Sequence, residues 1–590
     1  MERVESPPLR SDILDIEAET ASLRVKSTSY EVVLQAQKPY IDLYDANQKQ
    51  WASFFVMGEI NTLNGMDEGA GLGVYEYEQT EDCLTVRFPI DSVLWRRKTA
   101  VWKFTPDLIE TYFELEGNGK IVTCRYFGGN YADGKDSGFF PSQARFDRVF
   151  SPEPDERGEP IRPATEPAEV NVTGMSLPGR KDWIFAPAPY CFSFARANDD
   201  KWLSAGVAAP IEQQNFTGLH YETKQSAFSL SLDYEAHTEV NGYFRTPSIL
   251  LHVAADPYGA IADYRQHAEA LGYLKPPHKP AMPAWHSEPG MCGWGAADER
   301  SKTMPGVKAQ DLSRQELYEE DDNTLALHGI VPGVKTIDDK WQLQYGTNEV
   351  DETKWRDMPA YIGKSHMLGQ HVLLWFKAWD HEGVPEELCI RNRHNIPVSV
   401  DPSNPEYADF LRQQIERMLS PKGYNADGFK IDFTARTPSG VYLESYGDIW
   451  GTALLHRLMK IIHDTAKSVK PDALIVDHAP NPWFRDVADV KRNNDVFTHL
   501  PIISQMQHRS MVAQAACPEA LIDTDNWPMN SKAEWRRYLQ IQDKIGVPWL
   551  YFSSVIAGED MTNADYNALR RSWSRYRKTH SLLIPSEKTY

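Results

Sequence analysis

The sequence of 590 residues has few cysteines and no long apolar run. Its 6 cysteines are scattered, with no Cys-x-x-Cys pair and no spacing typical of a zinc site. We therefore expect reduced, mostly buried thiols, no metal and no cofactor. No apolar run approaches the ~20 residues needed to cross a bilayer, so we expect no membrane partner.

Basic residues are also fewer than acidic ones. Lys and Arg number 62 against 83 Asp and Glu, which gives a formal net charge of −21. Nucleic acids and anionic membranes need a basic face, so this balance argues against both as main partners. Residues 1–8 carry no apolar stretch after their charges and do not resemble a signal peptide. We expect a cytoplasmic protein, and whether it is a homo-oligomer is left open.

Length and periodicity predict two domains joined by a linker. Residues 1–256 contain short alternating segments, such as 84–88 and 228–232, separated by Gly, Asn, Asp and Pro clusters. This pattern is typical of an antiparallel β-sandwich with one wet face per sheet. Residues 257–280 predict a helix with Ile261 and Tyr264 on its apolar face, followed by a stiff Pro-rich linker.

Residues 281–590 show short apolar runs that alternate with helical segments, which indicates a parallel βα array. Eight strand–helix units predict a catalytic (β/α)8 barrel (TIM barrel). A doubly wound open sheet is the alternative, but it would not naturally place polar residues at the end of most strands. The predicted strands are 282–286, 333–338, 371–376, 428–432, 473–477, 489–492, 520–523 and 547–552.

Polar and aromatic side chains gather at the predicted C-terminal ends of these strands, the face that carries the active site of a (β/α)8 barrel. Helix capping explains one or two of the acids. It does not explain Asp-Asp-x-Trp at 338–341 together with Lys-x-Asp at 430–432. The residues at these ends are Trp285, His286, Asp338, Asp339, Trp341, Trp375, Lys377, Lys430, Asp432, Asp477, His478, Arg492, Asp495, Asp523 and Asp525.

The Lys-x-Asp motif places two charges on one face of a strand. Side chains alternate along a strand with period two, so Lys430 and Asp432 point into the same space. The ammonium would favour the ionised carboxylate and could donate to a substrate hydroxyl. A structural salt bridge is the alternative interpretation when this motif is taken alone.

Together the two motifs resemble the Asp-Asp-x-Trp and Lys-x-Asp motifs of the melibiase-type α-galactosidase clan. The run from Trp355 through 366–369 to Trp375, and the last helix at 566–582, are similar to those families as well. The resemblance covers most of residues 257–585, and the N-terminal β domain resembles in pattern only. It implies a retaining α-glycoside hydrolase that acts on terminal α-galactosides in oligosaccharides or other glycosides.

The resemblance also implies which carboxylates react. Asp432 would be the nucleophile. In these families an Arg shortly precedes the acid/base after the sixth strand, and 491–495 fits, so we predict Asp495, with Asp489 and then Asp477 as alternatives. A retaining enzyme holds its two carboxyl groups ~5 to 5.5 Å apart, and the acid must keep its proton near neutral pH.

The remaining matches imply substrate contacts. Asp338 and Asp339 would accept hydrogen bonds from sugar hydroxyls, including the axial one of galactose. Lys430 would bind hydroxyls beside the nucleophile. Trp285 and Trp375 would form part of an apolar wall. The other predicted substrate-binding residues are Arg492, Trp341, His478 and Lys377.

Three features depart from the family. Residues 284–288 read Ala-Trp-His-Ser-Glu where the family shows Trp-x-x-Trp. Lys377 and Asp380 stand where larger members show Glu and Pro, which allows a different substituent on the substrate. Only about ten residues separate the fifth and sixth predicted strands, so we expect a very short helix or a loop there.

Other functions remain open. An α-glucosidase, α-xylosidase or sulfoquinovosidase-like enzyme would use the same nucleophile, but the adjacent Asp338 and Asp339 favour the galactosidase. A transglycosylase would differ only in how water is excluded. A metal-dependent barrel hydrolase would normally show His-x-His or a dense His set, and only single histidines occur at these strand ends. A non-catalytic sugar-binding protein would not need acids at both catalytic positions.

Overall fold

The computed structural model describes residues 14–18, 22–35, 38–128, 130–131, 144–155, 157–173, 186–224, 227–276 and 282–581. Contacts divide the chain into two compact units. The first comprises 1–152, 159–170 and 190–274, and the second 153–158, 171–189 and 275–590. The predicted boundaries after 256 and 280 stay predictions. Residues 1–8 and residues 277–280 of the predicted linker lie outside the described residues.

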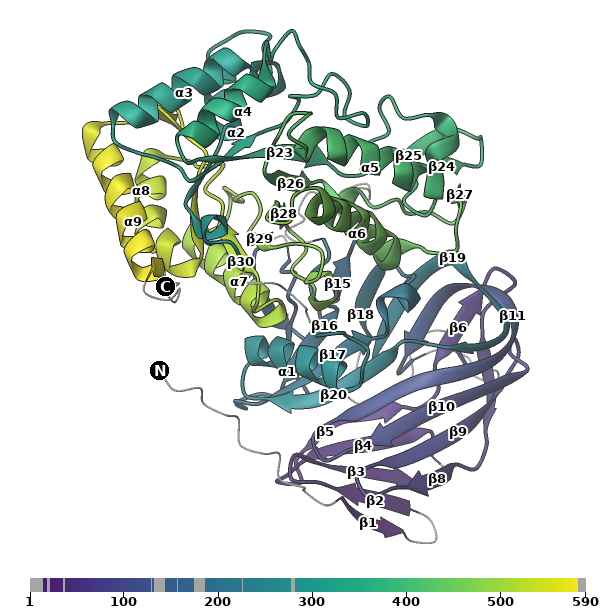
Figure 1. The fold of residues 1–590 in the computed structure, drawn as a ribbon. Coiled ribbons are helices and arrows are strands. Elements are labelled where there is room, and N and C mark those ends of the chain that lie inside the picture. Colours follow the sequence, from purple (N-terminus) through teal and green to yellow (C-terminus); the bar gives the residue numbers. More distant parts are fainter. Residues whose placement is uncertain are drawn as a thin grey trace, which may run out of the picture. The chain divides into compact units, whose positions relative to one another are not determined.

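The first unit is built from β-strands (Figure 1). One sheet runs β1-β2-β3-β4-β5, and a larger sheet runs β12-β7-β9-β10-β11-β20-β17-β16-β13-β14 with five strands off this path. The pairings whose register is described in these sheets are antiparallel, except that of β12 with β7. The antiparallel architecture is confirmed, whereas its packing as a sandwich stays a prediction.

The strand bounds of this unit are as follows. The small sheet comprises β1 (Asp15–Ala18), β2 (Ser22–Lys26), β3 (Tyr30–Gln35), β4 (Tyr40–Asp45) and β5 (Gln50–Phe55). The path of the larger sheet comprises β12 (Asn130–Tyr131), β7 (Glu68–Leu72), β9 (Leu84–Ser92), β10 (Arg97–Phe104), β11 (Ile109–Tyr126), β20 (Ser248–Ala254), β17 (Trp202–Ala208), β16 (Cys191–Ala195), β13 (Arg148–Phe150) and β14 (Ile161–Pro163). The strands off this path are β6 (Glu59–Thr62), β8 (Glu76–Gln79), β15 (Ala168–Asn171), β18 (Gly218–Lys224) and β19 (Ala227–Arg245).

Helix α1 (Pro257–Ala270) follows the last strand of this unit. The carboxylate of Asp256 caps it by accepting from the backbone N–H groups of Tyr258 and Gly259, and Pro257 occupies its first position. Ile261 and Tyr264 lie buried on one face, as their spacing predicts. The predicted helix is therefore confirmed.

The second unit contains a closed barrel of eight parallel strands. The strands pair in chain order, β21-β22-β23-β26-β28-β29-β30-β31, and β21 pairs with β31 to close the barrel. Helices follow most of the strands and lie around them (Figure 1), so the predicted (β/α)8 barrel is confirmed. The strands are β21 (Gly290–Cys292), β22 (Val334–Ile337), β23 (His371–Lys377), β26 (Gly428–Asp432), β28 (Leu474–Asp477), β29 (Val490–Arg492), β30 (Leu521–Thr524) and β31 (Val547–Leu550).

The barrel helices begin and face inward for reasons visible in the sequence. The Asn404 side chain caps the helix that starts at Pro405. In the next helix Leu454, Leu458 and Ile462 recur at helical spacing, and all are buried. The helices are α2 (Trp294–Lys302), α3 (Gln315–Leu327), α4 (Met358–Met367), α5 (Pro405–Leu419), α6 (Gly451–Val469), α7 (Ile502–Ala516), α8 (Lys532–Ile545) and α9 (Asn563–Ser581).

Two parts of the barrel depart from a regular strand–helix repeat. Between β28 and β29 the chain forms only the 3-10 helix η6 (Pro482–Phe484), so the predicted short connection is confirmed. The segments after β23 and after β26 together add a three-stranded sheet of β24 (Cys389–Asn392), β25 (Pro397–Val400) and β27 (Leu443–Glu444). In the described part of the chain, no helix is both long and apolar enough to span a membrane.

The first barrel strand differs from the prediction. Residues 284–287 form the 3-10 helix η2 (Ala284–Ser287), and the strand follows at β21. A Cβ at Gly290 would come within 2.6 Å of the Trp549 ring, so the strand depends on a glycine at a crowded position. The three residues of β21 begin with glycine and form no apolar run. The sequence pattern therefore favours the preceding segment, 282–286, as the first strand.

Candidate active site

The C-terminal ends of the barrel strands bring most of the predicted residues together. Asp338 and Asp339 follow β22, and His478 follows β28. The neighbouring strands β23 and β26 pair Trp375 with Lys430 and Lys377 with Asp432. Because parallel strands end at the same edge of the barrel, these side chains meet there with Arg492 of β29 and Asp495 beyond it.

Asp432 is held at the last position of β26. The Trp375 indole donates to its Oδ2 over 3.2 Å, and the backbone N–H of Phe433 donates to its Oδ1 over 2.9 Å. Its side chain remains 16% exposed, so the carboxylate is fixed yet open to a ligand. This combination suits a nucleophile, which must be both oriented and reachable.

Charges around Asp432 keep it ionised. Arg492 Nη1 lies 3.8 Å from Oδ2, and His478 Nδ1 lies 3.7 Å from Oδ1. Burial lowers the pKa of His478 to about 3, so this ring is neutral near pH 7. Burial acts to raise the pKa of Asp432, but the positive charges of Arg492 and Lys430 outweigh burial and bring that pKa below its usual range.

The backbone beside the acids is strained. Phe433 follows Asp432 with a φ of 61°, Lys340 follows Asp339 with a φ of 68°, and Asn494 precedes Asp495 with a φ of 65°. Left-handed backbone at residues other than glycine costs of order 1 kcal/mol and clusters at functional sites. Here it occurs at the residue next to each of the three acids.

Asp495 touches the same guanidinium from the other side. Arg492 Nη2 forms an ion pair with its Oδ1, and its side chain is 42% exposed. Although the side chain is partly exposed, desolvation of its carboxyl group among the surrounding side chains raises the pKa of Asp495 to about 6. The negative charges of Asp525 and Asp432 act in the same direction, and Arg492 opposes them. A carboxyl group with a raised pKa can carry a proton to a leaving group.

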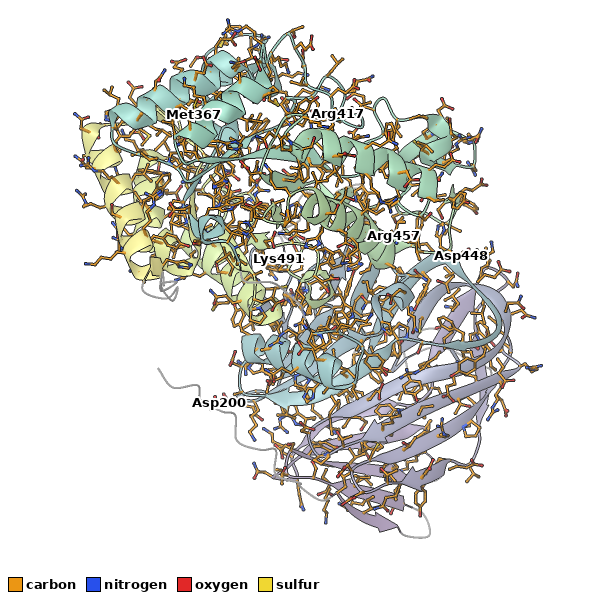
Figure 2. All side chains as sticks on the ribbon, viewed as in Figure 1. Asp200, Met367, Arg417, Asp448, Arg457 and Lys491 are labelled. Atoms are coloured by element: carbon orange, nitrogen blue, oxygen red, sulfur yellow. The ribbon has the colours of Figure 1, made fainter. Side chains whose placement is uncertain are left out.

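The two alternatives for the acid/base lie elsewhere. Asp489 precedes β29, and its Oδ2 accepts from the backbone of Ile475 and from Lys467, so it lies at the amino end of the barrel. Asp477 is fully buried and forms an ion pair with Lys491, which Figure 2 labels among the barrel elements. Neither carboxylate is presented to a ligand at the carboxyl end.

Lys430 pairs with a different acid from the one that Lys-x-Asp suggested. Its Nζ lies 2.7 Å from Asp338 Oδ2, and the two side chains are 3% and 5% exposed. The thiol of Cys292 donates to the same oxygen over 2.9 Å. Residues two apart on a strand are separated by ~6.6 Å, so Lys430 lies deeper than Asp432 and meets β22 instead. Burial acts to lower the pKa of Lys430, but the neighbouring acidic groups, Asp338 foremost, together outweigh burial and raise that pKa above its usual value.

Asp339 is fixed by a tyrosine. The Tyr345 hydroxyl donates to Asp339 Oδ1 over 2.7 Å. Burial raises the pKa of Asp339 to about 6; the Tyr345 hydrogen bond opposes this shift and the charge of Asp338 adds to it. Lys377 lies 3.7 Å from the centroid of the Tyr345 ring and is paired with Asp380 over 2.8 Å. The charge of Lys377 therefore already has a partner.

Two predicted tryptophans do not face the site. Trp341 is fully buried, and its indole donates to the backbone oxygen of Trp375 over 2.8 Å, so it supports the wall from behind. Trp285 stacks on the His371 ring with centroids 3.9 Å apart. His371 begins β23, so Trp285 lies at the amino end of the barrel, and its predicted role in the apolar wall is wrong.

Three residues of the site were not among the predicted ligands. The sequence indicates Asp525 only as an acid at a strand end, whereas in the structure its Oδ2 forms an ion pair with Arg492 Nη2 over 2.6 Å. Tyr345 lies in a loop, and Cys292 lies on β21, for which the sequence predicts the wrong segment. Neither residue belongs to a recognisable motif. Among the described residues no group of three or more His, Cys, Asp or Glu side chains is arranged to hold a metal ion.

A closed (β/α)8 barrel that follows an antiparallel β region, with acids at its carboxyl end, is the architecture that the sequence motifs led us to expect. No family model matches the sequence, and no curated protein matches it either. Solved structures do match it. The resemblance to the melibiase-type clan is therefore one of fold.

Three of these structures illustrate the likeness. The GH36 α-galactosidase AgaB from Geobacillus stearothermophilus is 11% identical, with 96% of this chain and 86% of that chain covered at a TM-score of 0.57. A GH31 family sulfoquinovosidase from E. rectale is 13% identical, with 97% and 83% covered at 0.59. The galactosidase domain of the α-galactosidase–sucrose kinase AgaSK is 12% identical, with 96% and 86% covered at 0.56.

The buried pair of Lys430 and Asp338 gives a test of this geometry. Lys430→Met leaves a buried carboxylate without its cation, so we expect a loss of about 3 kcal/mol in the free energy of unfolding of the barrel. Asp338→Asn added to Lys430→Met should recover most of that loss, because the charge is then gone. Calorimetry of the variants measures both effects.

The matched control is Lys460→Met, which breaks an i,i+4 pair with Asp464 on an exposed helix face. Its expected cost is about 0.5 kcal/mol. A Lys430→Met variant as stable as this control would contradict the buried ion pair.

Proposed function

We propose that the protein is a retaining glycoside hydrolase that cleaves terminal α-galactosides, with Asp432 as the nucleophile and Asp495 as the acid/base. The observation that carries this proposal is that two carboxylates at the carboxyl end of the barrel contact the same buried guanidinium. Arg492 touches both carboxylates, yet the pKa of Asp432 is lowered and that of Asp495 is raised to about 6. Divergent pKa values in one site are what separate a nucleophile from a proton donor.

The reaction divides these roles over two steps. In the first, an Asp432 oxygen forms a bond to the anomeric carbon as the bond to the leaving oxygen breaks, and that oxygen takes the proton of Asp495. In the second, Asp495 removes a proton from water, and the water oxygen displaces Asp432 from the anomeric carbon. The indole of Trp375 and the N–H of Phe433, which donate to Asp432 in the free protein, orient it for attack.

Three observations support a neutral galactoside as the substrate. Asp338 and Asp339 follow β22 as adjacent residues, and both are buried. Buried carboxylates are stabilised when a substrate hydroxyl donates a hydrogen bond to them. The Lys377 ammonium is paired with Asp380, which leaves less charge for an anionic substituent. The barrel also shares its fold with α-galactosidases. A sulfoquinovosidase shares the fold too, so a sulfonated substrate is the alternative that the assays below distinguish.

Asp432→Asn tests the nucleophile. Covalent catalysis has no substitute group, so we expect kcat on p-nitrophenyl α-galactoside to fall by ~10⁴-fold or more while the melting temperature stays near that of the wild type. Added azide should restore part of the turnover. Asp472→Asn, which changes an exposed Asp outside the site, is the matched control. An Asp432→Asn variant that kept a tenth of the activity would remove Asp432 from this role.

Substrate choice tests the pair after β22. We expect the wild type to hydrolyse α-galactosides more than about tenfold faster than α-glucosides, because a carboxylate left without its hydroxyl partner is costly. Asp339→Ala should narrow that ratio rather than lower both rates equally, and Asp472→Ala, which changes an exposed Asp outside the site, serves as the control. Kinetics on nitrophenyl α-galactoside, α-glucoside and α-sulfoquinovoside measure this. Equal or reversed preference would refute the galactoside assignment and leave the glycosidase mechanism intact.

A further inference from the structure

Arg492 is a single positive charge shared by three carboxylates. Its side chain is 1% exposed, and Asp525 binds it most fully, through Nε at 2.9 Å and Nη2 at 2.6 Å. Asp495 also contacts Nη2, and Asp432 lies 3.8 Å from Nη1. How the guanidinium divides its charge therefore decides how strongly each of the two reacting acids is held in its ionised form.

Contacts to both of its oxygens hold the Asp525 carboxylate in place beside Arg492. Its side chain is fully buried, and while its Oδ2 binds Arg492, its Oδ1 accepts the backbone N–H of Trp527 over 2.9 Å. Both oxygens are therefore fixed. A buried carboxylate with a two-point contact to a guanidinium sets the position of that guanidinium more firmly than a single contact does.

Asp523 provides a natural comparison two residues earlier on β30. It is 1% exposed, and its Oδ1 has no hydrogen-bond partner in the described part of the chain. No ion pair within 4 Å joins it to a described Lys, Arg or His, unlike Asp525. Burial and the neighbouring charge of Asp525 raise the pKa of Asp523 well above its usual value.

We propose that Asp525 is a positioning residue that holds Arg492 and takes up much of its charge, so that Asp495 can keep the proton it delivers. This inference rests on the proposed function, because it assigns Asp525 a role in proton donation by Asp495. Asp525 is not expected to contact the sugar.

The charges around Asp495 define what removal of Asp525 would do. Arg492, Asp525, Asp432 and Lys430 all act on its carboxyl group, and Arg509 of α7 binds its backbone oxygen over 2.7 Å. With Asp525 neutral, a negative neighbour disappears and Arg492 has more charge left for Asp495. Both changes favour the ionised acid, so Asp495 should lose its proton at lower pH.

The experiment compares Asp525→Asn with Asp523→Asn in the full-length protein. For Asp525→Asn we expect the alkaline limb of the pH profile of kcat/KM on methyl α-galactoside to move down by about one pH unit. At pH 7.5 the rate should fall about tenfold on this poor leaving group and much less on 2,4-dinitrophenyl α-galactoside, which needs little protonation. Asp523→Asn changes a buried acid on the same strand that forms no ion pair with Arg492, and it should leave the limb in place.

Three outcomes separate the inference from the proposed function. An unchanged limb in a folded Asp525→Asn variant, with Asp432→Asn inactive, overturns the inference alone. An active Asp432→Asn variant overturns the proposed function first. If Asp525→Asn does not fold, the test passes to Asp525→Glu, which keeps the charge: a wild-type limb with reduced kcat supports the inference, and a limb moved by one unit overturns it.

Discussion

The ion pairs of Arg492 are the interaction on which the site depends. The guanidinium is buried at the end of β29 and contacts acids from three segments: β26, the loop after β29 and the loop after β30. A buried cation of this kind is stable only when its partners are in place. The same contacts therefore tie three segments together and set different proton affinities for Asp432 and Asp495.

The barrel supplies the precision that this arrangement needs. Parallel pairing places Lys377 opposite Asp432 and Trp375 opposite Lys430. Charged and aromatic side chains from separate strands therefore lie at the same height along the barrel axis. Behind them Trp341 holds the backbone of Trp375, and Arg509 of α7 binds the backbone oxygens of the loop that ends at Asp495. A reacting group held by such supports needs little reorganisation during catalysis.

Periodicity and motifs predicted what local sequence encodes. Seven of the barrel strands were placed, because buried parallel strands such as β26 and β28 read as apolar runs with polar ends. The acids of Asp-Asp-x-Trp and Lys-x-Asp were found for the same reason. Contacts between strands could not be predicted from the local sequence. Lys430 pairs with Asp338, not with Asp432. Tyr345 contacts Asp339 and Asp525 contacts Arg492, and neither contact has a sequence motif. The role predicted for Trp285 is wrong because the apolar pattern of β21 is too weak to locate the first strand, and Trp285 lies before that strand.

The central claim is that Asp432 forms a covalent bond to the sugar. An activated 5-fluoro-α-galactosyl fluoride forms that bond readily but releases it slowly, so the intermediate accumulates and can be identified by mass spectrometry of the digested protein. The account predicts one fluorogalactosyl group per chain, attached to Asp432, with loss of activity in proportion to labelling. Attachment to Asp495 or to any other residue, or turnover of the reagent without a bound sugar, would contradict it.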